Sequence, residues 1–144
     1  MAILQIHAQL QADCHDLGRI ASCQVLLHTN PGVPWYIVVP ETAALELHEL
    51  TLRERLEVDR ITDSLARFIK HHHRSQRINV AAIGNRVPQL HIHVVGRSPG
   101  DPCWPDVVWG NLPPAAARCM SELRAIQTAL DGALADESER CDHS

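Results

Sequence analysis

The chain of 144 residues carries 13 Lys and Arg against 17 Asp and Glu, which gives a formal net charge of −4 with histidine neutral. This length fits one domain large enough to bury a hydrophobic core. No run of Lys or Arg stands out, which argues against binding along a nucleic-acid backbone, because that binding requires a clustered basic surface. No stretch approaches the roughly 20 apolar residues of a membrane-spanning helix.

The N-terminal residues and the cysteines both bear on cellular location. The first ten residues lack the basic and then apolar layout of a secretory signal. The five cysteines are an odd number without a Cys-x-x-Cys pair, which predicts reduced thiols rather than a disulfide framework or a zinc site. We therefore expect a cytoplasmic protein.

The first elements in chain order are two strands and a long helix. Strands are expected at residues 23–28 and 35–39, joined by a turn at residues 29–32 whose Asn, Pro and Gly are typical turn residues. Thr51 and Glu54 have the spacing of a capping box and predict a helix that ends near residues 71–73. The spacing of its apolar residues predicts one buried stripe. The stripe is expected to comprise Leu52, Leu56, Ile61, Leu65, Phe68 and Ile69.

The second half of the chain repeats this order. Strands are expected at residues 78–83 and 90–95, and residues 103–114 should be irregular because they are rich in proline. A second helix is expected from about residue 114 to residue 134. One domain then spans residues 1–135, and the polar residues 136–144 form a disordered tail. The order favours an α+β fold in which helices cover one face of an antiparallel sheet.

Three polar side chains share one face of the strand predicted at residues 90–95. Alternate residues of a strand point to the same side, about 7 Å apart, so Gln89, His91 and His93 face one way while the aliphatic residues between them face the other. Two interpretations fit this pattern. His91 and His93 can be metal ligands that require a third ligand elsewhere. Alternatively, one imidazole acts as a nucleophile while the other polar groups bind charged oxygens.

The sequence around these histidines resembles the motif of the histidine triad (HIT) family. The motif reads His-φ-His-φ-His-φ-φ, where φ is apolar, and Gln89, His91 and His93 stand at its three histidine positions. Residues 25–30 and 34–40 resemble the family's ribose-contacting strand and the strand that follows it. Residues 101–110 further resemble a bacterial branch of the family.

This resemblance implies a fold, a reaction and a set of site residues. It implies a HIT-like antiparallel sheet with helices packed on one face, and a homodimer. The central histidine, His91, would attack the α-phosphate of a nucleotide-containing substrate and form a nucleotidyl-histidine intermediate. His93 and Gln89 would bind phosphate oxygens or the leaving group, Asn85 a phosphate oxygen and Asn30 the ribose. The substrate would be a dinucleoside polyphosphate, a nucleoside phosphoramidate or a nucleotidyl conjugate, and no metal or other cofactor is required.

Three positions depart from the family pattern, and at one of them Asn85 has a shorter reach than the glutamine of many members. Gln89 replaces the first histidine, although its backbone carbonyl can still accept a hydrogen bond from the nucleophile. Trp35 stands where many members carry histidine, which removes a polar group near the phosphates. The departures at Gln89 and Trp35 keep a second interpretation open, in which the protein is a nucleotide-binding or sensing module with little turnover.

Overall fold

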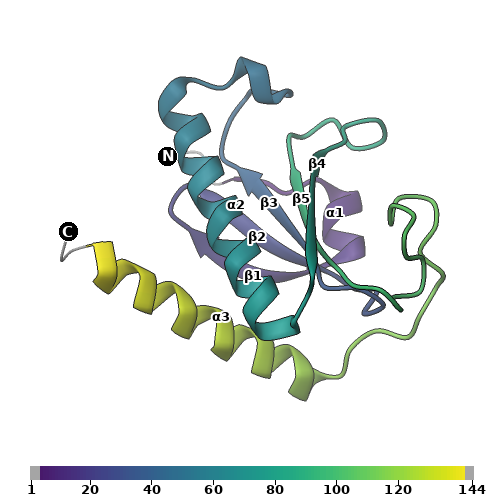
Figure 1. Ribbon diagram of the computed structural model, residues 1–144. Coiled ribbons are helices and arrows are strands. Elements are labelled where there is room, and N and C mark those ends of the chain that lie inside the picture. Colours follow the sequence, from purple (N-terminus) through teal and green to yellow (C-terminus); the bar gives the residue numbers. More distant parts are fainter. Residues whose placement is uncertain (1–3, 142–144) are drawn as a thin grey trace.

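The computed structural model describes residues 4–141. In this range the chain forms a five-stranded sheet, three α-helices and one short 3-10 helix, η1 (Figure 1). In chain order the elements are α1 (Ala8–Asp13), β1 (Cys14–Ile20), β2 (Cys23–His28), β3 (Trp35–Pro40), η1 (Leu47–Glu49), α2 (Leu52–His73), β4 (Arg77–Ala82), β5 (Ile92–Arg97) and α3 (Met120–Cys141).

The sheet is antiparallel and has the strand order β1-β2-β3-β5-β4. The two strands predicted in each half of the chain pair with each other, β2 with β3 and β4 with β5. In addition β5 pairs with β3 and thereby joins the two halves of the chain. In that ladder Ile37 lies opposite His93 and Trp35 lies opposite Val95. The predicted α+β fold is confirmed, and the strand expected at residues 90–95 begins two residues later, at Ile92.

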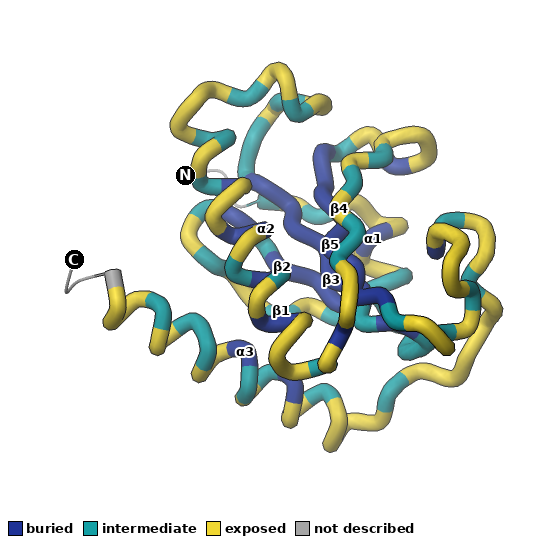
Figure 2. The backbone as a smooth tube through the Cα atoms, in the orientation of Figure 1, coloured by how far each residue is buried: buried dark blue, intermediate teal, exposed yellow. Residues whose placement is uncertain are grey.

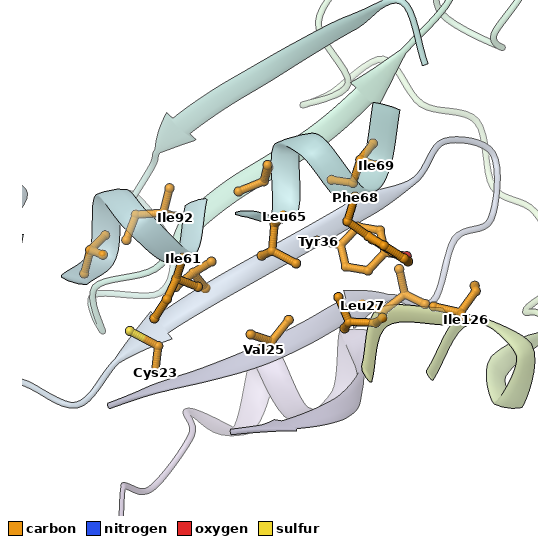
Figure 3. Close-up of a cluster of buried hydrophobic side chains, with 14 of the residues drawn as sticks. Cys23, Val25, Leu27, Tyr36, Ile61, Leu65, Phe68, Ile69, Ile92 and Ile126 are labelled. Atoms are coloured by element: carbon orange, nitrogen blue, oxygen red, sulfur yellow. The ribbon is translucent and has the colours of Figure 1, made fainter. Parts of the chain in front are cut away.

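The two long helices α2 and α3 cover one face of the sheet. Side chains from alternate positions of β2, β3 and β5 meet both helices there (Figure 3). Leu65 at the centre of α2 is fully buried against this face, and Ile126 of α3 completes its edge beside Leu27. Burying such aliphatic side chains stabilises the fold by about 1.5–3 kcal/mol each.

The opposite face of the sheet is covered without a long helix. A second apolar cluster there contains Trp35, Ile37 and Val95 from the sheet, Leu10 from α1, and Val108 from the irregular chain between β5 and α3. We call residues 98–119 the covering segment. Because both faces are covered, β3 and β5 are buried along their whole length (Figure 2).

Helix α2 begins and ends where the sequence predicts, but its predicted buried stripe is partly wrong. The capping box is present: the Thr51 hydroxyl accepts from the amide of Glu54, whose carboxylate accepts from the amide of Thr51. Leu52 and Leu56 are instead 76% and 56% exposed. At about 100° per residue, Leu56 lies on the opposite side of the helix from Leu65, so it cannot belong to the same stripe. The buried residues are Val58, Ile61, Thr62, Leu65, Phe68 and Ile69.

Helix α3 differs from the prediction at both ends. It begins at Met120 rather than near residue 114, after a non-helical stretch that contains Pro113 and Pro114. It continues to Cys141, so residues 136–141, which we expected to be disordered, are helical. Residues 142–144 lie outside the described residues, and the division of the chain into domain and tail stays a prediction. No helix within residues 4–141 is long and apolar enough to cross a membrane.

Candidate active site

Five aromatic side chains gather on the face of the sheet opposite α2 and α3. The stacked rings of His28 and Trp35 have centroids 4.3 Å apart, and the Trp35 and His93 centroids are 5.7 Å apart. His91 adjoins His93 at 4.8 Å, and Trp109 of the covering segment lies 5.3 Å from His93. We call these residues the histidine cluster. Strand alternation on β2, β3 and β5 places its sheet members on one face, as the sequence predicts for His91 and His93.

His91 lies immediately before β5, and its ring orientation is set by Gln89. Nδ1 of His91 is 2.7 Å from the backbone carbonyl oxygen of Gln89. A carbonyl oxygen can only accept, so Nδ1 must carry the hydrogen. In the neutral ring the lone pair is then on Nε2, which has no hydrogen-bond partner among the described residues. This is the arrangement that an imidazole nucleophile requires.

Nε2 of His91 keeps some exposure to solvent although the residue as a whole is only 5% exposed. Three side-chain atoms in the described part of the chain are enclosed and have no hydrogen-bond partner. They are His15 Nε2, Thr62 Oγ1 and Trp109 Nε1. His91 Nε2 is unpaired but is not one of these enclosed atoms. The small exposed area of the ring therefore includes Nε2.

His93 has the opposite tautomer. The indole Nε1–H of Trp35 donates to Nδ1 of His93 at 3.0 Å, so the hydrogen of the neutral imidazole is on Nε2. Burial, together with the nearby His91 and His28, lowers the pKa of His93 to about 3. His93 is therefore a neutral hydrogen-bond donor across the physiological pH range.

His28 joins the cluster from β2 and was not singled out as a site residue by sequence reasoning. Its Nδ1 accepts from the backbone N–H of Asn30 at 3.0 Å, which leaves its hydrogen on Nε2. Burial also lowers the pKa of His28 below its ordinary value. The available signal was the alternation along β2, which places His28 on the same face as Leu26 and away from the helices.

The side chain of Gln89 binds the N-terminal segment of the chain. Its amide oxygen accepts from the backbone N–H of His7 at 2.8 Å, and its amide nitrogen donates to the carbonyl of Gln5 at 2.9 Å. Its own carbonyl holds His91. Gln89 thus connects the N-terminal segment to His91, and contact of its side chain with a substrate stays a prediction.

The two predicted asparagines are placed differently. The Asn30 amide oxygen accepts from Gly32 N–H at 2.9 Å, while its nitrogen donates to the carbonyl of Pro113 in the covering segment at 2.9 Å. Asn30 therefore lies beside the cluster through His28 but is occupied by the protein's own backbone. Asn85 is exposed in the loop between β4 and β5, and its side chain makes no hydrogen bond within residues 4–141.

The covering segment is anchored at the end of β5 by a buried ion pair. Nε and Nη2 of Arg97 donate to the two carboxylate oxygens of Asp101 at 2.8 and 3.1 Å. Trp104 lies over the Arg97 guanidinium at 5.8 Å and stays partly exposed, whereas Trp109 packs edge-on against His93 and Trp35. Of the two tryptophans in this segment, only Trp109 enters the histidine cluster.

The metal interpretation requires a third ligand near His91 and His93. Among the residues that the structure describes, no three side chains of His, Cys, Asp or Glu come together in a way that could hold a metal ion. The neighbours that do surround the pair are two indole rings and a third imidazole whose Nδ1 is already bonded.

Solved structures with the same fold come from several bacteria. A histidine triad protein from Marinobacter aquaeolei is 34% identical, with a TM-score of 0.86 over 94% of this chain and 98% of the other. A HIT protein from Sinorhizobium meliloti is 32% identical, with a TM-score of 0.84 over 89% and 95%. A histidine triad protein from Bradyrhizobium japonicum is 31% identical, with a TM-score of 0.83 over 88% and 95%.

Curated relatives match a shorter part of the chain. A bis(5'-adenosyl)-triphosphatase from Saccharomyces cerevisiae is 34% identical over 79 residues, which cover 50% of this chain. The match spans only 38% of the yeast protein. The model of the HIT domain matches residues 9–100, which include β1 to β5, the His91–His93 pair and most of the histidine cluster. The chain therefore belongs to the HIT family, the histidine triad proteins.

Proposed function

We propose that this protein is a nucleotide hydrolase or nucleotidyl transferase that acts at the α-phosphate of a nucleotide-containing substrate. The observation that carries the proposal is the bond from His91 Nδ1 to the Gln89 carbonyl, which leaves an accessible lone pair on Nε2. The likeness to a yeast bis(5'-adenosyl)-triphosphatase supports a substrate in which a nucleoside phosphate carries a leaving group. Dinucleoside polyphosphates, nucleoside phosphoramidates and nucleotidyl conjugates all have this form.

The reaction would proceed in two displacements at phosphorus. The Nε2 lone pair of His91 attacks the α-phosphorus, and an N–P bond forms as the bond to the leaving group breaks. The leaving group departs with that electron pair and takes a proton from solvent. A water molecule or another acceptor then attacks the same phosphorus, its proton passes to solvent, and the electron pair of the N–P bond returns to Nε2. The Gln89 carbonyl stabilises the positive charge on the substituted imidazole.

The neighbouring side chains have separate roles in this proposal. His93 presents a neutral Nε2–H that can donate to a phosphate oxygen, because Trp35 occupies its Nδ1. Asn30 binds the ribose hydroxyls once its amide leaves the Pro113 carbonyl. Asn85 is free to contact a phosphate oxygen from the β4–β5 loop, and Gln89 contributes to phosphate or leaving-group binding near His91.

Turnover of adenosine phosphoramidate and diadenosine polyphosphates would test the proposal. We expect hydrolysis by the unmodified chain and its loss in His91→Ala, with the exposed His71→Ala as the control that keeps activity. A quenched reaction should contain protein that carries one nucleotidyl group at His91, detectable by mass spectrometry of the peptide. Full activity in His91→Ala would overturn the proposed nucleophile.

A nucleotide-binding or sensing module is the second candidate. Two features favour it: the Gln89 side chain binds backbone groups of His7 and Gln5 where the motif has an imidazole, and Trp35 places an indole ring in the cluster. This module would bind AMP with the same cluster but turn over little substrate. Binding of AMP by calorimetry without hydrolysis of any of the substrates above would establish it.

The assembly and location of the protein are also proposals. We infer a homodimer from the likeness to HIT proteins, and Leu52 and Leu56 on α2 and Val80 on the edge strand β4 provide exposed apolar surface for it. Sedimentation equilibrium should give twice the chain mass. We expect the protein in the cytoplasm, which fractionation of the source cells would check.

A further inference from the structure

Trp109 has a feature that packing alone does not explain. Its indole Nε1 is enclosed and has no hydrogen-bond partner among the described residues. Indole N–H is a donor only, and a buried donor without an acceptor destabilises the structure that encloses it. Trp35, which is buried, has its donor satisfied by His93. His15 Nε2 and Thr62 Oγ1 are also enclosed and unpaired, but Trp109 lies in the histidine cluster, where a bound ligand can supply the missing acceptor.

The Trp109 ring lies beside His93, which is itself next to His91, so a ligand of these two histidines would contact it. The ring stands edge-on to His93, with centroids 5.3 Å apart and planes at 72°, and edge-on to Trp35 at 6.1 Å and 82°. His93 is the neighbour of His91, at 4.8 Å between centroids. A group held between His91 Nε2 and His93 Nε2–H would therefore lie next to the Trp109 ring.

The charge of the site favours an anionic acceptor. His93 and His28 both present Nε2–H, and the depressed pKa of each keeps it uncharged. Arg118 adds a positive charge beside the cluster, since its guanidinium donates to the His28 backbone carbonyl at 3.1 Å. A further neutral donor helps such a site to hold phosphate oxygens, because a hydrogen bond to a charged acceptor is stronger than one to a neutral acceptor. No side-chain acceptor of the protein faces the indole nitrogen of Trp109 within the described chain.

We propose that Trp109 is a substrate-binding residue whose indole N–H donates a hydrogen bond to a phosphate oxygen of the nucleotide held by His91 and His93. This inference rests on the proposed function, because it places the phosphate beside those two histidines. If Trp109 has this role, the covering segment is part of the binding site as well as part of the scaffold.

The test compares three indole N–H signals in one protein. The three tryptophans give three indole cross-peaks in a ¹H–¹⁵N spectrum, assigned with Trp35→Phe, Trp104→Phe and Trp109→Phe. AMP is the phosphate-bearing probe and adenosine its matched control, while ring signals of ¹³C-labelled histidine report binding beside His91. We expect AMP, but not adenosine, to move the Trp109 indole proton downfield and leave that of Trp104 unchanged.

The effect on affinity provides a second measurement. Trp109→Phe keeps an aromatic ring and removes the donor, and we expect it to weaken AMP binding roughly tenfold or more while adenosine binding stays the same. Trp104→Phe is the matched control, since that ring lies over Arg97 outside the cluster. The spectrum of the unmodified protein keeps the test valid if Trp109→Phe does not fold.

Each result decides between distinct conclusions. If AMP shifts the His91 signal while the Trp109 indole signal stays in place, the role of Trp109 is wrong and the proposed function stands. An equal shift with adenosine would also contradict a bond to phosphate. If AMP moves neither histidine nor tryptophan signals, the proposed function fails and this inference fails with it.

Discussion

The indole nitrogen of Trp35 and Nδ1 of His93 are 3.0 Å apart across β3 and β5. Because indole can only donate, this bond holds the proton of neutral His93 on Nε2. We predict a single His93 tautomer in the unmodified protein and a mixture of both in Trp35→Phe. Long-range ¹H–¹⁵N correlation of the imidazole nitrogens would show this, with Trp104→Phe as control. A protonated Nδ1 in the unmodified protein would contradict the assignment.

The Gln89 side chain should contribute more to stability than to turnover. Gln89→Ala removes its bonds to His7 and Gln5, which should lower the free energy of unfolding by about 1 kcal/mol in a urea titration. Gln89→Glu should cost at least as much, because its carboxylate faces the Gln5 carbonyl and cannot donate. The backbone carbonyl that orients His91 remains in both variants, so turnover should fall less than roughly tenfold.

Exposed Gln76 provides the matched control for this prediction, since its side chain makes no hydrogen bond in the described part of the chain. Gln76→Ala should leave the urea transition unchanged. An unchanged transition in Gln89→Ala, together with a large rise in KM, would instead support the direct phosphate contact expected from the sequence.

Asn30 should determine how strongly the protein distinguishes ribose from a sugar without hydroxyls. The amide that would bind the hydroxyls is bonded to Pro113, so a ribose must compete with that carbonyl. We predict that the unmodified protein binds AMP more tightly than 2',3'-dideoxy-AMP and that Asn30→Ala binds the two equally. Calorimetry with both ligands would measure the ratio. A ratio that survives in Asn30→Ala would place the ribose elsewhere.

Two histidines, the buried His93 and the half-buried His73, should make the fold sensitive to mild acid. The pKa of His93 is lowered to about 3 and that of His73 to about 4, mainly because burial disfavours the charged form. The unfolded chain, with an ordinary histidine pKa of about 6.5, binds these protons first. The free energy of unfolding is therefore unaffected by these histidines above pH ~6.5. It falls as the pH drops toward 4, by up to about 1.4 kcal/mol per pH unit for each histidine.

Chemical unfolding at several pH values would measure this slope. His93→Gln and His73→Gln should each make it shallower, whatever they do to stability at neutral pH. His73→Gln also tests the bond between its Nε2 and the Tyr36 hydroxyl at 2.8 Å. The exposed His71→Gln should leave the slope as it is, and an equal slope in all four proteins would contradict the prediction.

Local sequence patterns predicted the centre of this fold better than its edge. The continuous apolar runs of β2 and β3 and the capping box at Thr51 have strong local signals. Strand β1 and the short helix α1 were not predicted, because β1 is a half-exposed edge strand without regular alternation. Its register shifts between Asp16 and Arg19, where Gly18 has a φ of 99°.

Of the candidate site, only the part that follows from the alternation of side chains along a strand could be predicted from the sequence. Alternation was sufficient to place His91 and His93 on one face, and their rings do adjoin. The bonds from Gln89 to His7 and from Asn30 to Pro113 could not be predicted, because these partners are backbone groups 82 and 83 residues away in the chain. Trp109 could be identified as a cluster member only after the covering segment had been placed against the sheet.

The hydrogen bonds of the three clustered histidines have a consequence for ion selectivity. Nδ1 of His28 and of His93 each accepts a hydrogen bond, so both rings offer N–H, not a lone pair, at Nε2. A metal ion bound at His93 Nε2 would force the proton onto Nδ1, where it would meet the N–H of Trp35, donor against donor. The bond from Trp35 thus disfavours a metal ion at His93 Nε2, while His91 Nε2 keeps its lone pair unpaired.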